Sequence, residues 1–287
     1  GPINVNTDIL SYKQIEDQNP DLQLGGHYSP TKCKARHHVA ILVPYRDRQA
    51  HLKIFLQNIH PFLQKQQIDY SIYIIEMVSG VKFNRAMLFN IGYVESSKLY
   101  NHTCFIFHDV DLVPENDLNI YSCSEDHPRH MSVAIDKMHY KLPYNQIFGG
   151  ASAMTKDQFE LVNGFSNLYF GWGGEDDDMY NRIVHNKMNI IRFSSAVARY
   201  KMLSHAKDSP NPVRSRLLKQ SDRRFKTDGL NSLDYEVLKI SKRQLYTWIL
   251  VKVDDNVPLP ALVSINFVIF REIEIGLSLK KWNQKFL

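Results

Sequence analysis

The sequence predicts an α/β fold built on a mostly parallel sheet. Apolar runs of strand length alternate with segments in which apolar residues recur at helical spacing, as in βαβ units. The run at 39–43 is continuous, β-branched and aliphatic, which is typical of a parallel strand buried on both faces. Acidic and polar motifs follow these runs, at the edge of a parallel sheet where ligands bind.

The N-terminal half predicts four strands and two helices. Residues 1–36 are polar and aperiodic, so we expect a lead-in segment there. An apolar run at 39–43 predicts the first strand, and the spacing of Leu52, Phe55 and Ile59 predicts the helix that follows. The other expected elements are strands at 70–75, 103–107 and 131–135 and a helix at about 84–94.

The C-terminal half predicts two helices and a lid. Thr155 can cap a helix that ends before Asn163-Gly164. Glu175 can open a helix that runs to about Asn186, because acidic residues favour a helix N-terminus. Residues 203–230 are polar and basic, and loops of this length are often lids over active sites.

The composition fits one globular domain or one domain with an appendage. With 287 residues, 44% of them apolar, the chain can bury a large core, so we expect a domain at 37–253 and a tail of unknown role at 254–287. The net charge of +5 suits an anionic ligand such as a nucleotide, but no dense basic block indicates nucleic-acid binding. No apolar run reaches the roughly 20 residues that span a bilayer, so we expect any membrane anchor upstream of this sequence.

The three cysteines leave two alternatives open. Cys104 and Cys123 flank a predicted strand and its loop, and they could form a disulfide while Cys33 stays unpaired. A cytosolic protein with three reduced cysteines is the alternative. Asn101 begins an Asn-His-Thr sequon, which is weak evidence for the secretory pathway because such triplets often occur by chance.

Three groups of residues carry candidate chemistry. Asp109 and Asp111 follow a strand directly, where their carboxylates could bind a divalent ion together with a diphosphate, or could lie in a solvated turn. The segment 171–178, Gly-Trp-Gly-Gly-Glu-Asp-Asp-Asp, holds more acids than helix capping needs, which indicates hydroxyl binding and a general base on a mobile, Trp-bearing loop. Met202 and His205 would favour Mn²⁺ over Mg²⁺ as metal ligands, although each alone is more typical of a core and a surface residue.

Together these motifs resemble the β-1,4-galactosyltransferase family of inverting enzymes with the GT-A fold. The resemblance covers approximately residues 1–253. Its motifs lie at residues 44–48, 83–86, 109–111, 142–144, 148–150, 171–178 and 228–233.

The resemblance implies a role for each matching position. Asp111, Met202 and His205 would bind Mn²⁺, and Asp176 would be the general base that takes the proton from the acceptor 4-hydroxyl. The acceptor sugar would be bound by Tyr144, Gln146, Asp177 and Arg214. The UDP-sugar would be bound by Pro44, Tyr45, Arg46, Arg48, Phe83, Arg85, Val110, Lys137, Gly150, Trp172 and Glu175.

The resemblance also bears on the cysteines and on the donor sugar. Family members bridge the positions of Cys104 and Cys123 and pair that of Cys33 with an upstream cysteine. Where galactose-transferring members usually have Tyr, this chain has Ile147, as in members that use UDP-GalNAc. The smaller side chain leaves room for an acetamido group at C2 of the donor sugar.

We therefore expect transfer of GalNAc from UDP-GalNAc to the 4-hydroxyl of a terminal N-acetylglucosamine, on a glycoprotein or glycolipid, in a β-1,4 linkage. The expected setting is the Golgi lumen, in a single-pass type II membrane protein. Galactose transfer from UDP-Gal to the same acceptor is the first alternative. A catalytically silent sugar-binding relative and a hydrolytic or two-metal nuclease site are the others.

Overall fold

A seven-stranded sheet forms the centre of the molecule, which a computed structural model describes at residues 1–206 and 208–255. Its strand order is β5-β7-β3-β1-β2-β10-β9. The central strands β3, β1, β2 and β10 run parallel, whereas β7, β5 and β9 are antiparallel to their neighbours. The predicted α/β fold is confirmed. The strands of this sheet are β1 (His38–Tyr45), β2 (Asp69–Met77), β3 (Cys104–His108), β5 (Arg129–His130), β7 (Ala151–Thr155), β9 (Glu236–Lys242) and β10 (Thr247–Lys252).

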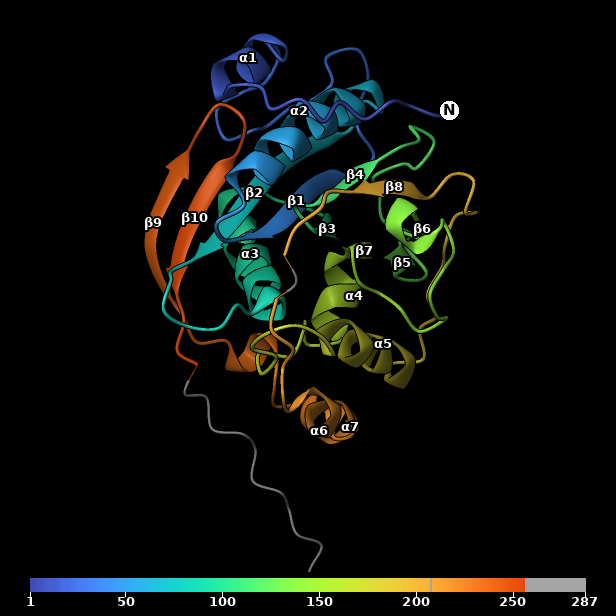
Figure 1. The fold of residues 1–287 in the computed structure, drawn as a ribbon, viewed down its shortest axis with the longest axis vertical. Coiled ribbons are helices and arrows are strands. Elements are labelled where there is room, and N and C mark those ends of the chain that lie inside the picture. The colour runs from blue at the N-terminus through green and yellow to red at the C-terminus, as the bar shows by residue number, and fades with distance from the viewer. Residues whose placement is uncertain (207, 256–287) are drawn as a thin grey trace, which may run out of the picture. The chain divides into compact units, whose positions relative to one another are not determined.

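Helices cover both faces of this sheet (Figure 1). The α-helices are α1 (Tyr12–Asp17), α2 (Gln49–Lys65), α3 (Arg85–Leu99), α4 (Lys156–Leu161), α5 (Glu175–His185), α6 (Arg214–Leu218) and α7 (Ser221–Arg224), and two 3-10 helices are η1 (Asp136–Met138) and η2 (Leu230–Ser232). None of the helices in the described ranges is both long and apolar enough to cross a bilayer.

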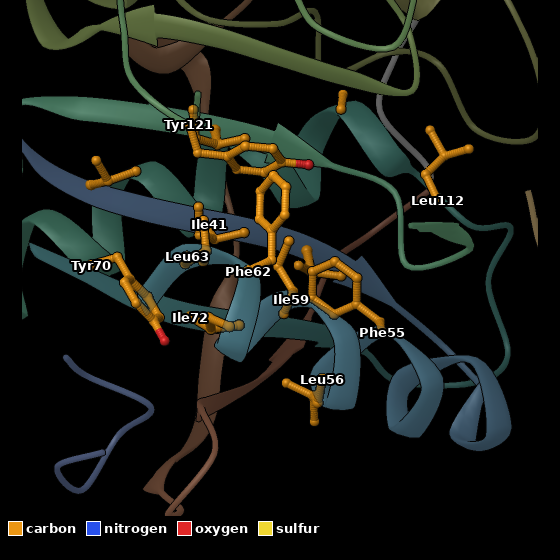
Figure 2. Packing of buried hydrophobic residues seen from close by; sticks show 14 of the residues in the cluster. Ile41, Phe55, Leu56, Ile59, Phe62, Leu63, Tyr70, Ile72, Leu112 and Tyr121 are labelled. Atoms are coloured by element: carbon orange, nitrogen blue, oxygen red, sulfur yellow. The ribbon is translucent and has the colours of Figure 1, made fainter. Parts of the chain in front are cut away.

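Alternate residues of β1 point to two separate cores. Ile41 packs with Phe55 and Ile59 of α2, and Figure 2 shows this cluster. Leu42 points to the opposite face, where it packs with Phe89 of α3. Because strand side chains alternate between faces, one continuous apolar run supplies both cores.

A second, three-stranded sheet has the order β4-β8-β6, with β4 (Leu112–Pro114), β6 (Ala134–Ile135) and β8 (Arg199–Met202). The single strand expected at 131–135 is therefore wrong: β5 and β6 are separate and belong to different sheets. Three residues, Asp109 to Asp111, connect β3 to β4. The Asp-Val-Asp motif therefore lies where the chain passes from the large sheet to the small one.

Two segments contain more structure than the sequence predicted. The lead-in at 1–36 contains α1, which begins with a capping box of Ser11 and Gln14 and buries Ile15 in the same core as α2. The expected lid at 203–230 contains α6 and α7. The part of the predicted tail from residue 256 onward lies outside the described residues.

Candidate active site

A cavity of about 640 Å³ lies at the carboxyl ends of β1 and β3. Parallel strands that end at one edge of a sheet bring the segments that follow them together. The first residues of α3 and α5, the end of β8 and the segments at 143–150, 171–174 and 208–218 also contribute to its wall. The predicted site residues on this wall are Pro44, Arg46, Arg48, Phe83, Arg85, Val110, Asp111, Tyr144, Ile147, Gly150, Trp172, Glu175, Asp176, Asp177, Met202, His205 and Arg214.

Three predicted residues do not line the cavity. Tyr45 is buried in the core on the α2 side, because it alternates along β1 with Pro44, which faces the cavity. Lys137, in η1, and Gln146, in the loop before β7, have exposed side chains. In place of Lys137, its neighbour Met138 contributes to the wall.

Several residues on the cavity wall lie outside the predicted site set, among them Ile135, Met138 and Asp208. Ile135 could have been found, because it ends a predicted strand. Asp109, which the sequence offered with Asp111 as a carboxylate for a divalent ion, also lies on the wall. Met138 and Asp208 lie in segments with no periodic pattern, so nothing in the sequence marks them.

Arg85 occupies the centre of the site. Its Nε donates to Asp109 Oδ1 at 2.5 Å, and its Nη1 lies 3.5 Å from Glu175 Oε1. Its guanidinium also lies over the ring of Phe89, 4.6 Å from the centroid. Asp109 is therefore paired with an arginine, whereas the second carboxylate of the motif, Asp111, lies beside His205.

Asp111, Met202 and His205 lie together at the start of the small sheet. His205 Nε2 is 3.0 Å from Asp111 Oδ2, and Met202 pairs with Leu112 across β4 and β8. The other ring nitrogen of His205 lies 2.6 Å from the carbonyl of Ala206. If that nitrogen carries the proton, Nε2 is left with a lone pair beside Asp111, which is the usual arrangement of a metal-binding histidine.

These three side chains fit a divalent metal. Burial and the charge of Asp109 raise the pKa of Asp111 to about 6, against the effect of His205, and a bound cation would stabilise the ionised form of this carboxylate. In the described part of the chain no three His, Cys, Asp or Glu side chains are grouped as a metal site. The set of one carboxylate, one imidazole and one thioether contains only two such residues, and its mixed donors suit Mn²⁺ better than Mg²⁺.

Asp176 lies in the first turn of α5 and packs against the backbone of Gly149, where there is no space for a side chain. A Cβ added at Gly149 would lie 2.7 Å from Asp176 Oδ2. Burial, followed by the charges of Glu175 and Asp177, raises the pKa of Asp176 to about 7. A carboxylate with a pKa near neutrality is suited to proton transfer.

The fourth acid of the run, Asp178, has a different function from its neighbours. Two residues along a helix turn the side chain by about 200°, so Asp178 points away from Asp176 and into the protein. Its carboxylate accepts from Arg182 Nε at 2.7 Å and from Arg224 Nη2 at 3.0 Å, and it is fully buried. The run of acids therefore serves both the cavity and a buried ion-pair cluster.

The Trp172 loop is joined to the segment after β8. Trp172 N–H donates to the Ser209 carbonyl at 3.0 Å, and Asn211 N–H donates to the Trp172 carbonyl at 2.9 Å. The guanidinium of Arg214 lies 5.1 Å from the centroid of the Trp172 ring, which is 60% exposed. Movement of one segment would therefore move the other.

Two family models match this chain. Residues 1–124 match the N-terminal region of glycosyl transferase group 7, and residues 129–206 match a model described as the N-terminal domain of galactosyltransferase.

Curated relatives show the same similarity. β-1,4-Galactosyltransferase 1 of Mus musculus is 47% identical over 257 residues, which are 88% of this chain and 64% of that protein. β-1,4-Galactosyltransferase 4 of Cricetulus griseus is 49% identical over 245 residues, which are 84% of this chain and 71% of that protein. The chain thus spans less than two thirds of the first of these relatives.

Solved structures resemble this one in fold. The catalytic domain of Drosophila β-1,4-galactosyltransferase 7, in complex with xylobiose, has a TM-score of 0.66 at 28% identity, covering 76% of this chain and 94% of that one. A mutant of that protein, in complex with manganese, UDP-Gal and xylobiose, has a TM-score of 0.67.

Proposed function

This chain belongs to the β-1,4-galactosyltransferase family, and from that premise we propose that it transfers a hexose from a UDP-sugar to the 4-hydroxyl of a terminal N-acetylglucosamine, with inversion. One observation carries the proposal: a single cavity holds the Asp111, Met202 and His205 set and the carboxylate of Asp176. A metal-assisted displacement needs one group of each kind. We place the catalytic domain at 37–253, as the sequence predicts.

The donor side of the cavity has the chemistry of a nucleotide site. Arg46 and Arg48 can bind phosphate oxygens with charge-assisted hydrogen bonds. Phe83 lies on the cavity wall, 5.2 Å from the Arg46 guanidinium, and offers a ring face to the base. Glu175 Oε2 is buried without a hydrogen-bond partner in the protein, so it can accept from a sugar hydroxyl.

The metal is proposed to be Mn²⁺, held by Asp111, Met202 and His205. When bound, it supplies positive charge that offsets the charge developing on the leaving diphosphate. The manganese and UDP-Gal complex of the Drosophila relative supports this assignment. Asp111 contributes the charged ligand, and the Ala206 carbonyl orients the imidazole of His205.

Asp176 is proposed as the general base. Its carboxylate can accept the proton of the acceptor hydroxyl as that oxygen attacks the anomeric carbon from the face opposite to UDP. Tyr144, Asp177 and Arg214, on the same wall, are proposed to bind the acceptor sugar. One displacement needs one base, so the neighbouring acids act as binding groups.

We propose the Golgi lumen as the compartment. Cys104 and Cys123 form a disulfide, and disulfides persist in oxidising compartments. Cys33 is exposed and has no disulfide partner within the described ranges.

The comparisons favour galactose as the transferred sugar, because the named relatives are galactosyltransferases. They therefore support galactose transfer from UDP-Gal, which was the first alternative in the sequence analysis, over the GalNAc transfer that the sequence predicted. One observation still favours GalNAc as a second candidate: Ile147 lies on the cavity wall, where a Tyr would take up more space.

Ile147→Tyr tests the donor assignment. If Ile147 makes room for the acetamido group, the variant should shift the ratio of kcat/KM for UDP-GalNAc to that for UDP-Gal towards galactose by ~10–200-fold. Both donors are measured in both proteins with one acceptor, with Mn²⁺ activation as a control that should not change. A wild type that prefers UDP-Gal would assign the enzyme to galactose, and a ratio unmoved by Tyr would mean that Ile147 does not select the donor.

The acid limb of the pH profile tests Asp176. A base must be ionised to accept a proton, so kcat/KM should fall as pH drops through about 7, the pKa that burial and the charges of Glu175 and Asp177 give Asp176. Glu175→Gln removes one of those charges and should move the limb to lower pH. A limb that does not move in this variant would mean that another group controls the profile.

UDP release separates the candidate activities. With Mn²⁺ present, we expect release from a UDP-hexose to depend on an added N-acetylglucosaminide and to stop on chelation. UDP release at the same rate with and without the acceptor would indicate hydrolysis. Binding of the UDP-hexose without UDP release would indicate a catalytically silent sugar-binding protein.

A further inference from the structure

The loop that carries Ile147 is held mainly by side chains of other segments. Within residues 142–149, which the structure describes in full, the one backbone–backbone hydrogen bond runs from Ile147 N–H to the Tyr144 carbonyl, at 3.4 Å. That is a long hydrogen bond. A segment that shapes a cavity wall therefore needs support from outside itself.

Arg192 supplies that support. Its Nη2 donates to the carbonyls of Asn145 at 2.9 Å and of Ile147 at 2.8 Å. Its Nε donates to His130 Nδ1 at 3.1 Å. Arg192 itself does not line the cavity, so any effect on a ligand must pass through the loop.

His130 extends the contact to a third carbonyl. Its Nε2 lies 3.0 Å from the carbonyl of Gly149, and Ser132 Oγ donates to the same oxygen at 3.1 Å. Burial, together with the positive charge of Arg192, lowers the pKa of His130 to about 3, so the ring is neutral. A neutral ring that accepts on Nδ1 must carry its proton on Nε2, which matches the direction of both bonds.

The alternate carbonyls of residues 145, 147 and 149 are thus fixed from one side. Ile147 faces the candidate donor site, and Gly149 lies against the carboxylate of Asp176. Arg192 is fixed in turn, because Ile191 N–H donates to the Pro128 carbonyl and the Ile191 carbonyl accepts from His130 N–H, at 3.0 Å each.

We propose that Arg192, through its bonds to the carbonyls of Asn145 and Ile147 and through His130, is a positioning residue that sets donor-sugar discrimination by fixing the 145–149 loop. This inference rests on the proposed UDP-hexose transfer. If the loop becomes mobile, the cavity wall at Ile147 can accommodate either donor sugar. The discrimination between UDP-Gal and UDP-GalNAc then decreases.

The test compares Arg192→Met with a matched control, Arg129→Met. Arg129 is a buried arginine on β5 whose guanidinium donates to the Ile120 carbonyl and lies over the Phe193 ring, and within the described residues it makes no hydrogen bond to the loop. We expect Arg192→Met to lower kcat/KM for the better donor ~10-fold or more, because small misplacements near reacting groups have large effects on rate. The ratio of the two donors should move towards unity by ~5-fold or more, whereas Arg129→Met should lower Tm and leave the ratio unchanged.

Arg192→Lys keeps the positive charge and a flexible ammonium donor, so it should recover part of the discrimination between the two donors. If the Met variant does not fold, the donor ratio of the Lys variant is compared with that of the wild type instead. A wild-type ratio in a folded Arg192 variant overturns the inference and leaves the proposed function intact. A wild type that transfers from neither UDP-sugar refutes the proposed function itself.

Discussion

Asp176→Asn is expected to lower kcat for sugar transfer by ~10²–10⁴-fold, the usual contribution of a general base. The amide has nearly the shape of the carboxylate but cannot accept the acceptor's proton. Asp176 is not among the proposed metal ligands, and Asp111 and His205 contact each other without it. The dissociation constants of UDP and Mn²⁺, measured by calorimetry, should therefore remain close to the wild-type values.

Asp177→Asn is the matched control, since it makes the same change one residue along α5. Because Asp177 is proposed to bind the acceptor, this variant should raise the acceptor KM and reduce kcat much less. Equal losses of kcat in both variants, or a parallel loss of UDP affinity in Asp176→Asn, would contradict the assignment of the base.

Asp178→Ala is expected to lower the free energy of unfolding by about 3–5 kcal/mol, as breaking a buried ion pair does. Asp178 is fully buried and bonds to Arg182 and Arg224, and the Tyr169 hydroxyl donates to it at 3.0 Å. Removing this carboxylate leaves two buried guanidiniums to share Asp228. Denaturant unfolding of the purified chain measures the loss.

The control is a surface pair with the same i,i+4 spacing. Lys13 and Asp17 are both exposed, so solvent screens their interaction and Asp17→Ala should change stability little. If Asp178→Ala were as stable as Asp17→Ala, the buried cluster would not be the stabilising feature that its geometry indicates.

The central sheet and the location of the site could be predicted because both depend on local patterns. The run that became the centre of β1 is apolar from Val39 to Val43, and the motifs that begin at Pro44 and Asp109 lie at or just after strand ends, which the topology brings to one edge. The small sheet could not be predicted, because strands of two to four residues are too short to show a period.

Features that depend on long-range contacts were not visible in the sequence. Asp176 and Asp178 belong to one acidic run, and only the turn of α5 separates a candidate base from a buried partner of Arg224. Arg192 reaches the loop around Ile147 across 45 residues of sequence, and no local motif marks it. Lys137 and Gln146 were assigned to the site from the family resemblance, but both side chains are exposed. A resemblance in sequence therefore does not by itself place a side chain on the cavity wall.

The linkage formed in the product tests the central claim most directly. The wild-type chain is incubated with Mn²⁺, an α-linked UDP-hexose and a simple N-acetylglucosaminide, and the purified product is analysed by NMR spectroscopy. We predict one new glycoside, β at its anomeric carbon and attached to O4 of the acceptor, which is absent when the metal is chelated. An α-linked product, attachment at another hydroxyl, or free hexose without any glycoside would contradict the account.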